Sequence, residues 1–263
     1  MPRNEAPELM SGYALPFPVL VPRYSGFLAR TDGEIVVSLN RVGKQSVRRL
    51  RAAVNVFMRL ARTGAMCGDM VPAGGSTIDL EEGRVEQSHF HFAFTSAAVD
   101  DRAVLVLTHL LFTQHQWLDI ERVRVLAGGI GEYVQVGRDP DENTTYPSRA
   151  VLPFTLEDEE PESQAITLEV RFEEAPSETV VKTLDQSFKR WSDAIVRGGY
   201  ALALVPPEES HVESYDDGFL VVDGAAERSY HKLTADDAAI DAALNILAAV
   251  HARVQRIRLV RLT

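Results

Sequence analysis

Two histidines on either side of a phenylalanine are the first candidates for chemistry. His89 and His91 flank Phe90, and Phe92 and Phe94 continue the alternation. Alternate residues of a strand point to one face, so the two imidazoles would lie about 7 Å apart. We expect them to be exposed or hydrogen-bonded. The alternative is a divalent metal held by both rings and by one or two further ligands.

Further ligands would have to come from elsewhere in the chain. Glu34, His109 or a residue of the other half could complete such a site. The spacing is common in half-buried strands, so we expect no cofactor, with the metal kept as the alternative. If the protein is an enzyme, His91 is the residue that we expect to act as an acid or base.

Cationic side chains are expected on the uncovered face of each predicted sheet. Those of the first half are Arg122 and Arg124, and those of the second are Arg171, Arg256 and Arg258 with Tyr230, beside Thr167, Glu169, Arg228 and Lys232. We expect both faces to be solvated. In the alternative, the two sheets meet and enclose a polar groove, where the paired arginines would clamp an anionic small molecule.

The usual sequence signatures of enzymes are missing. The glycines at 74–75 and 128–131 follow no strand-to-helix phosphate-loop pattern, and there is no G-x-S-x-G element. Cys67 falls on a predicted strand without an evident partner. No residue type in these patterns names a reaction, so we expect a protein that is not an enzyme.

A repeated pattern of apolar residues organises the chain. Val47, Leu50, Val54, Phe57 and Ala61 have helical spacing, and the same spacing recurs 134 residues later, at Val181, Leu184, Phe188, Trp191 and Ile195. A glycine follows each run, at Gly64 and Gly198, as it commonly does at helix ends. The pattern indicates a duplication.

Each copy is expected to follow the order β-α-β-β-α-β. The expected elements are 35–39, 47–61, 65–71, 87–95, 100–115 and 120–125, then 166–172, 179–196, 200–205, 228–233, 236–251 and 254–262. This order predicts an α+β fold made of two ferredoxin-like units, each a four-stranded antiparallel sheet with two helices on one face. The predicted divisions are an extended lead-in (1–33), a first unit (34–126), an acidic connector containing Pro and Gly (127–164) and a second unit (165–263).

Charge and cysteine content limit the classes of function. The net charge is −11, and residues 127–263 carry 13 Lys or Arg against 25 Asp or Glu. Acidity argues against general nucleic-acid binding, which depends on neutralising phosphates. The single cysteine favours a reducing compartment, so we expect a cytoplasmic protein. No apolar run has the roughly 18 residues that a membrane span needs.

A predicted loop at 208–224 is longer than a hairpin requires. His211, Tyr215, Asp216 and Asp217 lie in it, and we expect them to contact a partner. The main hypothesis is a non-enzymatic interaction protein, such as an immunity-type inhibitor or an assembly subunit, whose acidity favours a basic protein partner. The alternative is an enzyme or binding protein with an anionic small molecule between its halves. The sequence does not determine whether the protein forms an oligomer.

Tandem ferredoxin-like units resemble, in architecture alone, the repeat-type RNA endonucleases of CRISPR systems and the dimeric α/β-barrel enzymes. No motif transfers any residue role from these families. The endonuclease resemblance implies a glycine-rich loop near the C-terminus and basic surfaces, whereas this chain ends in Val-Arg-Leu-Thr and is acidic. We therefore rank the endonuclease function low.

Overall fold

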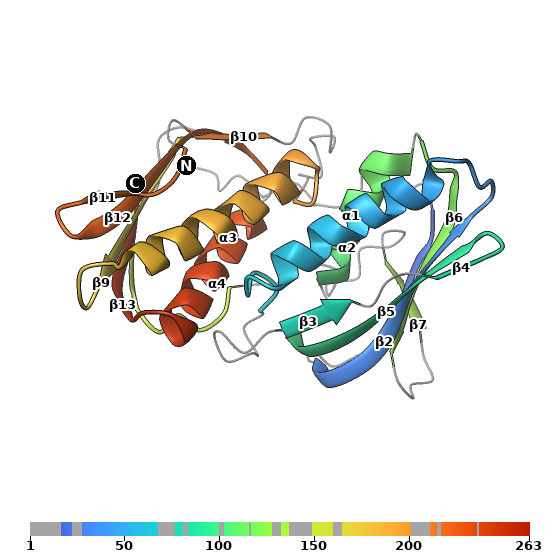
Figure 1. Ribbon diagram of the computed structural model, residues 1–263, viewed down its shortest axis with the longest axis horizontal. Helices are drawn as coiled ribbons and strands as arrows, with labels where there is room; N and C mark the ends of the chain where they lie inside the picture. The colour runs from blue at the N-terminus through green and yellow to red at the C-terminus, as the bar shows by residue number, and fades with distance from the viewer. Residues whose placement is uncertain are drawn as a thin grey trace, which may run out of the picture.

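Two β-sheets lie on the outer sides of the described structure, and four helices lie between them (Figure 1). The computed structural model describes residues 17–22, 28–67, 77–80, 84–99, 103–115, 117–127, 133–136, 149–159, 165–200, 211–214, 217–235 and 237–263. We call 17–136 the first half and 149–263 the second half. The fold is mixed α+β, as predicted.

The elements of the first half are β1 (Val19–Pro22), β2 (Leu28–Leu39), α1 (Ser46–Ala61), β3 (Thr77–Leu80), β4 (Arg84–Glu86), β5 (His89–Val99), α2 (Val104–His115), β6 (Ile120–Ala127) and β7 (Tyr133–Val136). Those of the second half are β8 (Thr155–Asp158), β9 (Ile166–Phe172), α3 (Glu178–Val196), β10 (His211–Ser214), β11 (Leu220–Val222), β12 (Ala225–Thr234), α4 (Ala238–Arg253) and β13 (Ile257–Leu262). No helix among the described residues is long and apolar enough to cross a membrane.

The two sheets share a strand order but are not the antiparallel four-stranded sheets that we expected. The first runs β3-β5-β2-β6-β1-β7 and the second β10-β12-β9-β13-β8, with β4 and β11 as extra partners of β5 and β12. β1 pairs with β6 in parallel, and β8 pairs with β13 in parallel. These two strands lie in the predicted lead-in and connector. Their partners are distant in sequence, so the local pattern could not reveal the pairing.

The helices follow the apolar spacing closely. α1 and α3 bury their apolar positions in the core, and each ends before a glycine with positive φ, +94° at Gly64 and +78° at Gly198. The Ser177 hydroxyl accepts a hydrogen bond from the Val180 N–H at 3.4 Å and so caps the N-terminus of α3. Helical period and caps therefore suffice to define these elements.

Some predicted positions of strands and loops were wrong. Residues 65–67 form a turn rather than a strand, so Cys67 is buried in a turn, and β3 lies in the segment expected to be a loop. The predicted loop at 208–224 holds β10 and β11. Residues 201–205, expected to form a strand, lie outside the described residues. Short strands at a sheet edge have little periodicity, which explains these errors.

The closing strands do not align at the offset of 134 residues that relates the two helical runs, which would match Arg124 with Arg258. Val123 of β6 and Val260 of β13 are fully buried, and each pairs with the first long strand of its own half. Counted from these two residues, Arg124 matches Arg261 and not Arg258. Alternating apolar residues permit both alignments in the sequence, and only burial distinguishes them.

The halves meet through their helices. α1 packs against α3, and Asn245 of α4 donates to the carbonyl oxygens of Ala65 (3.3 Å) and Cys67 (2.6 Å). Its Oδ1 accepts a hydrogen bond from the Ala150 N–H at 2.8 Å. The helical layers therefore separate the two sheets. The alternative prediction, in which the sheets meet around a polar groove, is wrong. The apolar faces of the helices are buried against each other, so the helices form the contact between the halves.

Candidate functional site

The two histidines lie on the outer face of the first sheet, as predicted. Their rings are 6.5 Å apart between centroids and nearly perpendicular. The Ser38 hydroxyl and Nδ1 of His89 form a hydrogen bond of 2.8 Å, and Nδ1 of His91 lies 3.1 Å from Oε1 of Glu34. Each histidine thus interacts with a neighbouring side chain of β2.

These contacts do not build a metal site. No cluster of three His, Cys, Asp or Glu suited to a metal occurs among the described residues. His109, proposed as a further ligand, is buried in α2 on the helix side of the sheet, and burial lowers its pKa to about 4. Glu34 also lies 3.7 Å from Arg84. His89 and His91 therefore stand as side chains with protein partners.

Arg122 and Arg124 lie on the same outer face, half-buried, where their strand pairs with Ser38 and Val36. Nη2 of Arg122 is 3.9 Å from a Glu121 oxygen, a weak contact. Its Nε is buried without a hydrogen-bond partner in the described part of the chain. The first outer face is cationic, as the sequence indicated.

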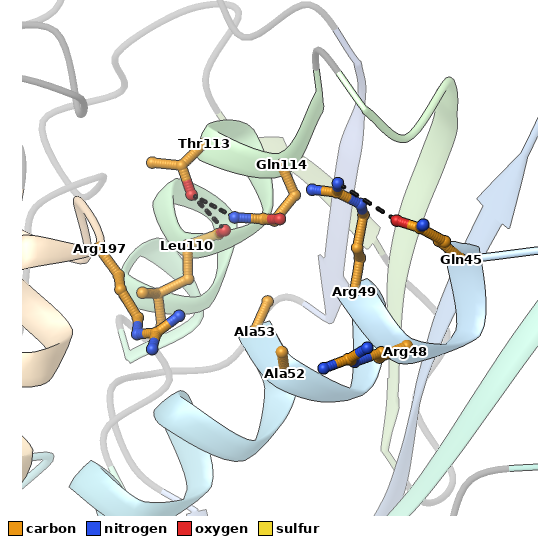
Figure 2. Close-up of a pocket in the computed structure, with 9 residues that line it drawn as sticks. All are labelled: Gln45, Arg48, Arg49, Ala52, Ala53, Leu110, Thr113, Gln114 and Arg197. Carbon is orange, nitrogen blue, oxygen red and sulfur yellow. Dashed lines mark hydrogen bonds between the residues drawn. The ribbon is translucent and has the colours of Figure 1, made fainter.

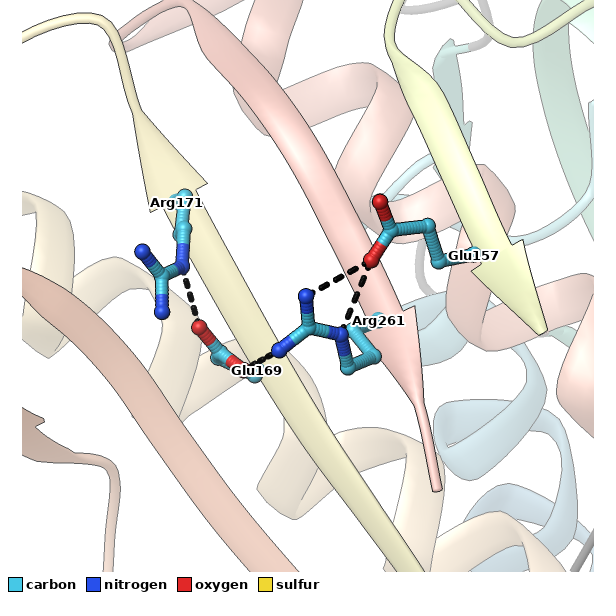
Figure 3. A network of polar contacts seen from close by, with 4 residues as sticks. All are labelled: Glu157, Glu169, Arg171 and Arg261. Atoms are coloured by element: carbon cyan, nitrogen blue, oxygen red, sulfur yellow. Dashed lines mark hydrogen bonds and ion pairs between the residues drawn. The ribbon is translucent and has the colours of Figure 1, made fainter. Parts of the chain in front are cut away.

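The outer face of the second sheet is an ion-pair ladder instead (Figure 3). Arg261 of β13 donates to Glu157 of β8 at 2.7 Å and to Glu169 of β9 at 3.0 Å, and Arg171 pairs with Glu169. The hydrogen bonds and charge of Glu157, together with the charge of Glu169, raise the pKa of Arg261. Arg171 is thus neutralised by a carboxylate, which weakens its predicted role in holding an anion.

Tyr230 and Arg228 lie on the opposite side of the sheet from the one predicted. The Tyr230 ring packs edge-on against Trp191 of α3, with 5.3 Å between centroids, and burial raises the pKa of its hydroxyl. The Arg228 guanidinium lies over the same ring at 5.3 Å. The predicted alternation along β12 assigned its residues to the wrong faces. Tyr230 is a core residue.

Arg256 and Arg258 do not meet the arginines of the first half. Arg256 precedes β13 and Arg258 lies on the strand, and both side chains are exposed. Neither has an ion pair with a described residue. The helices lie between β13 of the second sheet and β6 of the first, the strand that carries Arg122 and Arg124 (Figure 1). The predicted four-arginine clamp is therefore not assembled.

The predicted partner-contact segment begins in β10. His211 and His231 both contact the Glu213 carboxylate, the latter at 2.7 Å, and these hydrogen bonds lower the pKa of Glu213. Asp217 is exposed, and Tyr215 and Asp216 lie outside the described residues. The segment is therefore a folded sheet edge and not only a loop.

Beside it, β11 exposes three consecutive apolar side chains at the edge of the second sheet. Leu220, Val221 and Val222 are 54%, 54% and 42% exposed. Among the described residues β11 pairs only with β12, so its outer backbone edge is open. Asp223 and Gly224, both with positive φ, form the hairpin turn. We call Leu220–Val222 the β11 edge.

Acidic residues surround the β11 edge. Residues 211–227 hold five Asp or Glu and no Lys or Arg. The equivalent hairpin strand of the first half, β4, reads Arg-Val-Glu, and Arg84 and Glu86 form an ion pair of 3.5 Å. β11 was not predicted from the sequence, although the run Leu-Val-Val-Asp-Gly has the signature of a hairpin.

Comparisons with known proteins add no assignment to these sites. No protein-family model matches the chain, and no curated protein matches it significantly. The functional argument therefore depends on the geometry alone.

Proposed function

We propose that this protein is a non-enzymatic, cytoplasmic interaction protein that binds an extended, basic segment of another protein along the β11 edge. The observation that carries the proposal is the run of three exposed apolar residues on an open edge strand. Natural proteins usually protect such edges with charges, turns or cover, because an open edge is a template for another strand. An unprotected one is typical of strand addition by a partner.

The charge around the edge specifies the partner. Glu213, Asp217, Asp223 and Glu227 lie in or beside β10–β12, without any Lys or Arg in 211–227. An extended segment with alternating apolar and basic residues would place its apolar side chains on Leu220 and Val222 and its cations near these carboxylates. Backbone hydrogen bonds would supply affinity, and charge would supply selectivity.

The test places a lysine on the β11 edge and a matched lysine on β4, the equivalent strand of the first half. The wild type and the variants Val221→Lys and Val85→Lys are used as bait in extracts of the source cells, and bound proteins are quantified by mass spectrometry. Val85 is a suitable control because it is 44% exposed in β4. We expect a basic protein to be retained by the wild type and by Val85→Lys, and to be lost at least tenfold with Val221→Lys.

Salt provides the second criterion. Because opposite charges contribute to the contact, we expect retention to fall as salt rises from about 0.05 to 0.5 M, where the Debye length drops well below 10 Å. A partner lost equally with both variants, or one that is acidic, would contradict the proposal. So would the absence of any protein that distinguishes Val221→Lys from the wild type.

The two halves also support the finer proposal of tandem ferredoxin-like units. Within the sheets, the orders β3-β5-β2-β6 and β10-β12-β9-β13 are the same along the chain, and each closing strand gains a parallel neighbour. The sequence Leu-Pro-Phe occurs before β1 and before β8. Phe17 contacts the His115 ring at 5.5 Å, and Phe154 contacts the His251 ring at 6.2 Å. A shared origin explains these correspondences.

A further inference from the structure

A cavity of about 240 Å³ lies between α1 and α2, and the second half closes one of its sides (Figure 2). Figure 2 shows Arg48 and Arg49 extending from α1 on one side and Arg197, which follows α3, on the other. Its remaining polar lining comes from Gln45, Thr113 and Gln114. Three guanidinium groups from two halves of the chain therefore frame one space.

The lining is positive and lacks a compensating acid. Among the residues that the structure describes, no Asp or Glu lines the cavity. Arg197 pairs with Asp193 at 2.7 Å, one turn earlier, where both side chains are largely exposed. Arg48 has no ion pair with any described residue, and Arg49 donates to a neutral amide oxygen of Gln45 at 3.4 Å. At least two of the three cations thus lack a carboxylate partner in the described part of the chain.

The start of α1 adds to this positive potential. Gln45 is its N-cap, without a capping hydrogen bond from the side chain, and no acidic residue lies in the first turn. Residues 41–62 hold seven Lys or Arg and no Asp or Glu, in a protein with a net charge of −11. Cations at a helix N-terminus oppose the helix dipole, so their presence there costs stability unless an anion is bound.

We infer that this cavity binds a small phosphate-bearing molecule. Arginine forks match phosphate oxygens in charge and geometry, and the neighbouring amides of Gln45 and Gln114 offer further donors. The ligand would contact α1 and α2 of the first half and Arg197 of the second, and so would hold the halves together. This site is separate from the β11 edge and does not depend on the proposed partner.

Inorganic pyrophosphate is the probe, measured by calorimetry at low salt and by thermal unfolding. We expect saturable binding with one site per chain and a rise in melting temperature, because the ligand binds the folded state alone. Trp117 is 59% exposed and lies 4.6 Å under the Arg49 guanidinium, so binding should also change its fluorescence. Trp117→Phe should abolish that signal and preserve the calorimetric binding.

Charge-neutral variants test the location. Arg48→Gln and Arg197→Gln should each weaken pyrophosphate binding by about tenfold, since each removes a charge-assisted hydrogen bond. Arg59→Gln is the matched control, because Arg59 lies in the last turn of the same helix and does not line the cavity. Its affinity should stay within about twofold of the wild type.

Three results would overturn the inference. The first is the absence of pyrophosphate binding at millimolar concentration to a folded wild-type chain. The second is an equal loss of affinity with Arg59→Gln and Arg48→Gln, which would indicate general charge attraction. The third is binding of a single-stranded oligonucleotide without binding of pyrophosphate, which would assign the cations to a nucleic-acid backbone.

Discussion

Helices α2 and α4 occupy equivalent places in the two halves but carry different buried polar residues there. At an offset of 136 residues, which also relates His115 to His251, His109 of α2 matches Asn245 of α4, and both are buried. Asn245 satisfies three backbone groups of the chain, and its amide cannot titrate. His109 is kept neutral by burial, with its pKa lowered to about 4. Equivalent helices therefore carry a side chain that does not titrate in the second half, Asn245, and a titratable one in the first half, His109.

The sheet edges differ in the same way. β4 and β11 are equivalent hairpin strands, but β4 carries Arg84 and Glu86 around Val85, whereas β11 is apolar throughout. Charges protect the first edge from pairing, and the second lacks them. The two halves therefore share the strand order of their cores and differ at an exposed strand, where substitutions cost little stability.

The largest predicted effect concerns Asn245. Asn245→Leu should lower the free energy of unfolding by about 4 kcal/mol, because it leaves up to three buried backbone groups unsatisfied at about 1–3 kcal/mol each. Urea unfolding measures the change. Asn55→Leu, on the exposed side of α1, is the control and should change stability by less than about 0.5 kcal/mol. Similar values for both variants would show that Asn245 does not secure the contact between the halves.

The next effect compares the two glycines that end α1 and α3. Gly64→Ala should cost about 3 kcal/mol, because it adds strain at positive φ and places a Cβ 2.5 Å from that of Ala249 in α4. Gly198→Ala meets the strain of positive φ and should cost about 1 kcal/mol. Thermal and urea unfolding measure both. Equal losses of stability in the two variants would mean that the close contact of position 64 with α4 adds no cost to the substitution.

The smallest effect is the pH dependence from His109. Its pKa is about 4 in the folded protein and near 6.5 in the unfolded chain, so only the unfolded state gains a proton between these values. Stability should therefore fall by about 2 kcal/mol as the pH drops from about 7 to 5. His109→Asn, which copies the residue of α4, should remove that part of the decline. The same dependence of the free energy of unfolding on pH in the wild type and in His109→Asn would contradict this explanation.

Much of the helical framework was predictable from local pattern. The apolar spacing of α1 and α3 and the glycines after them follow from a period of 3.6 residues, which needs no distant partner. The position of Glu34 beside His91 follows in the same way, because strict alternation fixes the face of a long strand, whereas His109, proposed with it, lies on the helix side of the sheet. These features depend on contacts within a few residues.

The parallel strands, the facing of Tyr230 and the relation between the sheets were not predictable in this way. The partners of β1 and β8 lie about a hundred residues away, and the register of β12 depends on Trp191 and the helices that cover it. The sequence alone defined the helices and the uneven charge, because each depends on composition or short-range period. Only the tertiary structure determined that the helices separate the sheets, that Arg197 joins Arg48 and Arg49, and that the β11 edge stays open. Packing of distant apolar surfaces makes those choices, and no local pattern contains it.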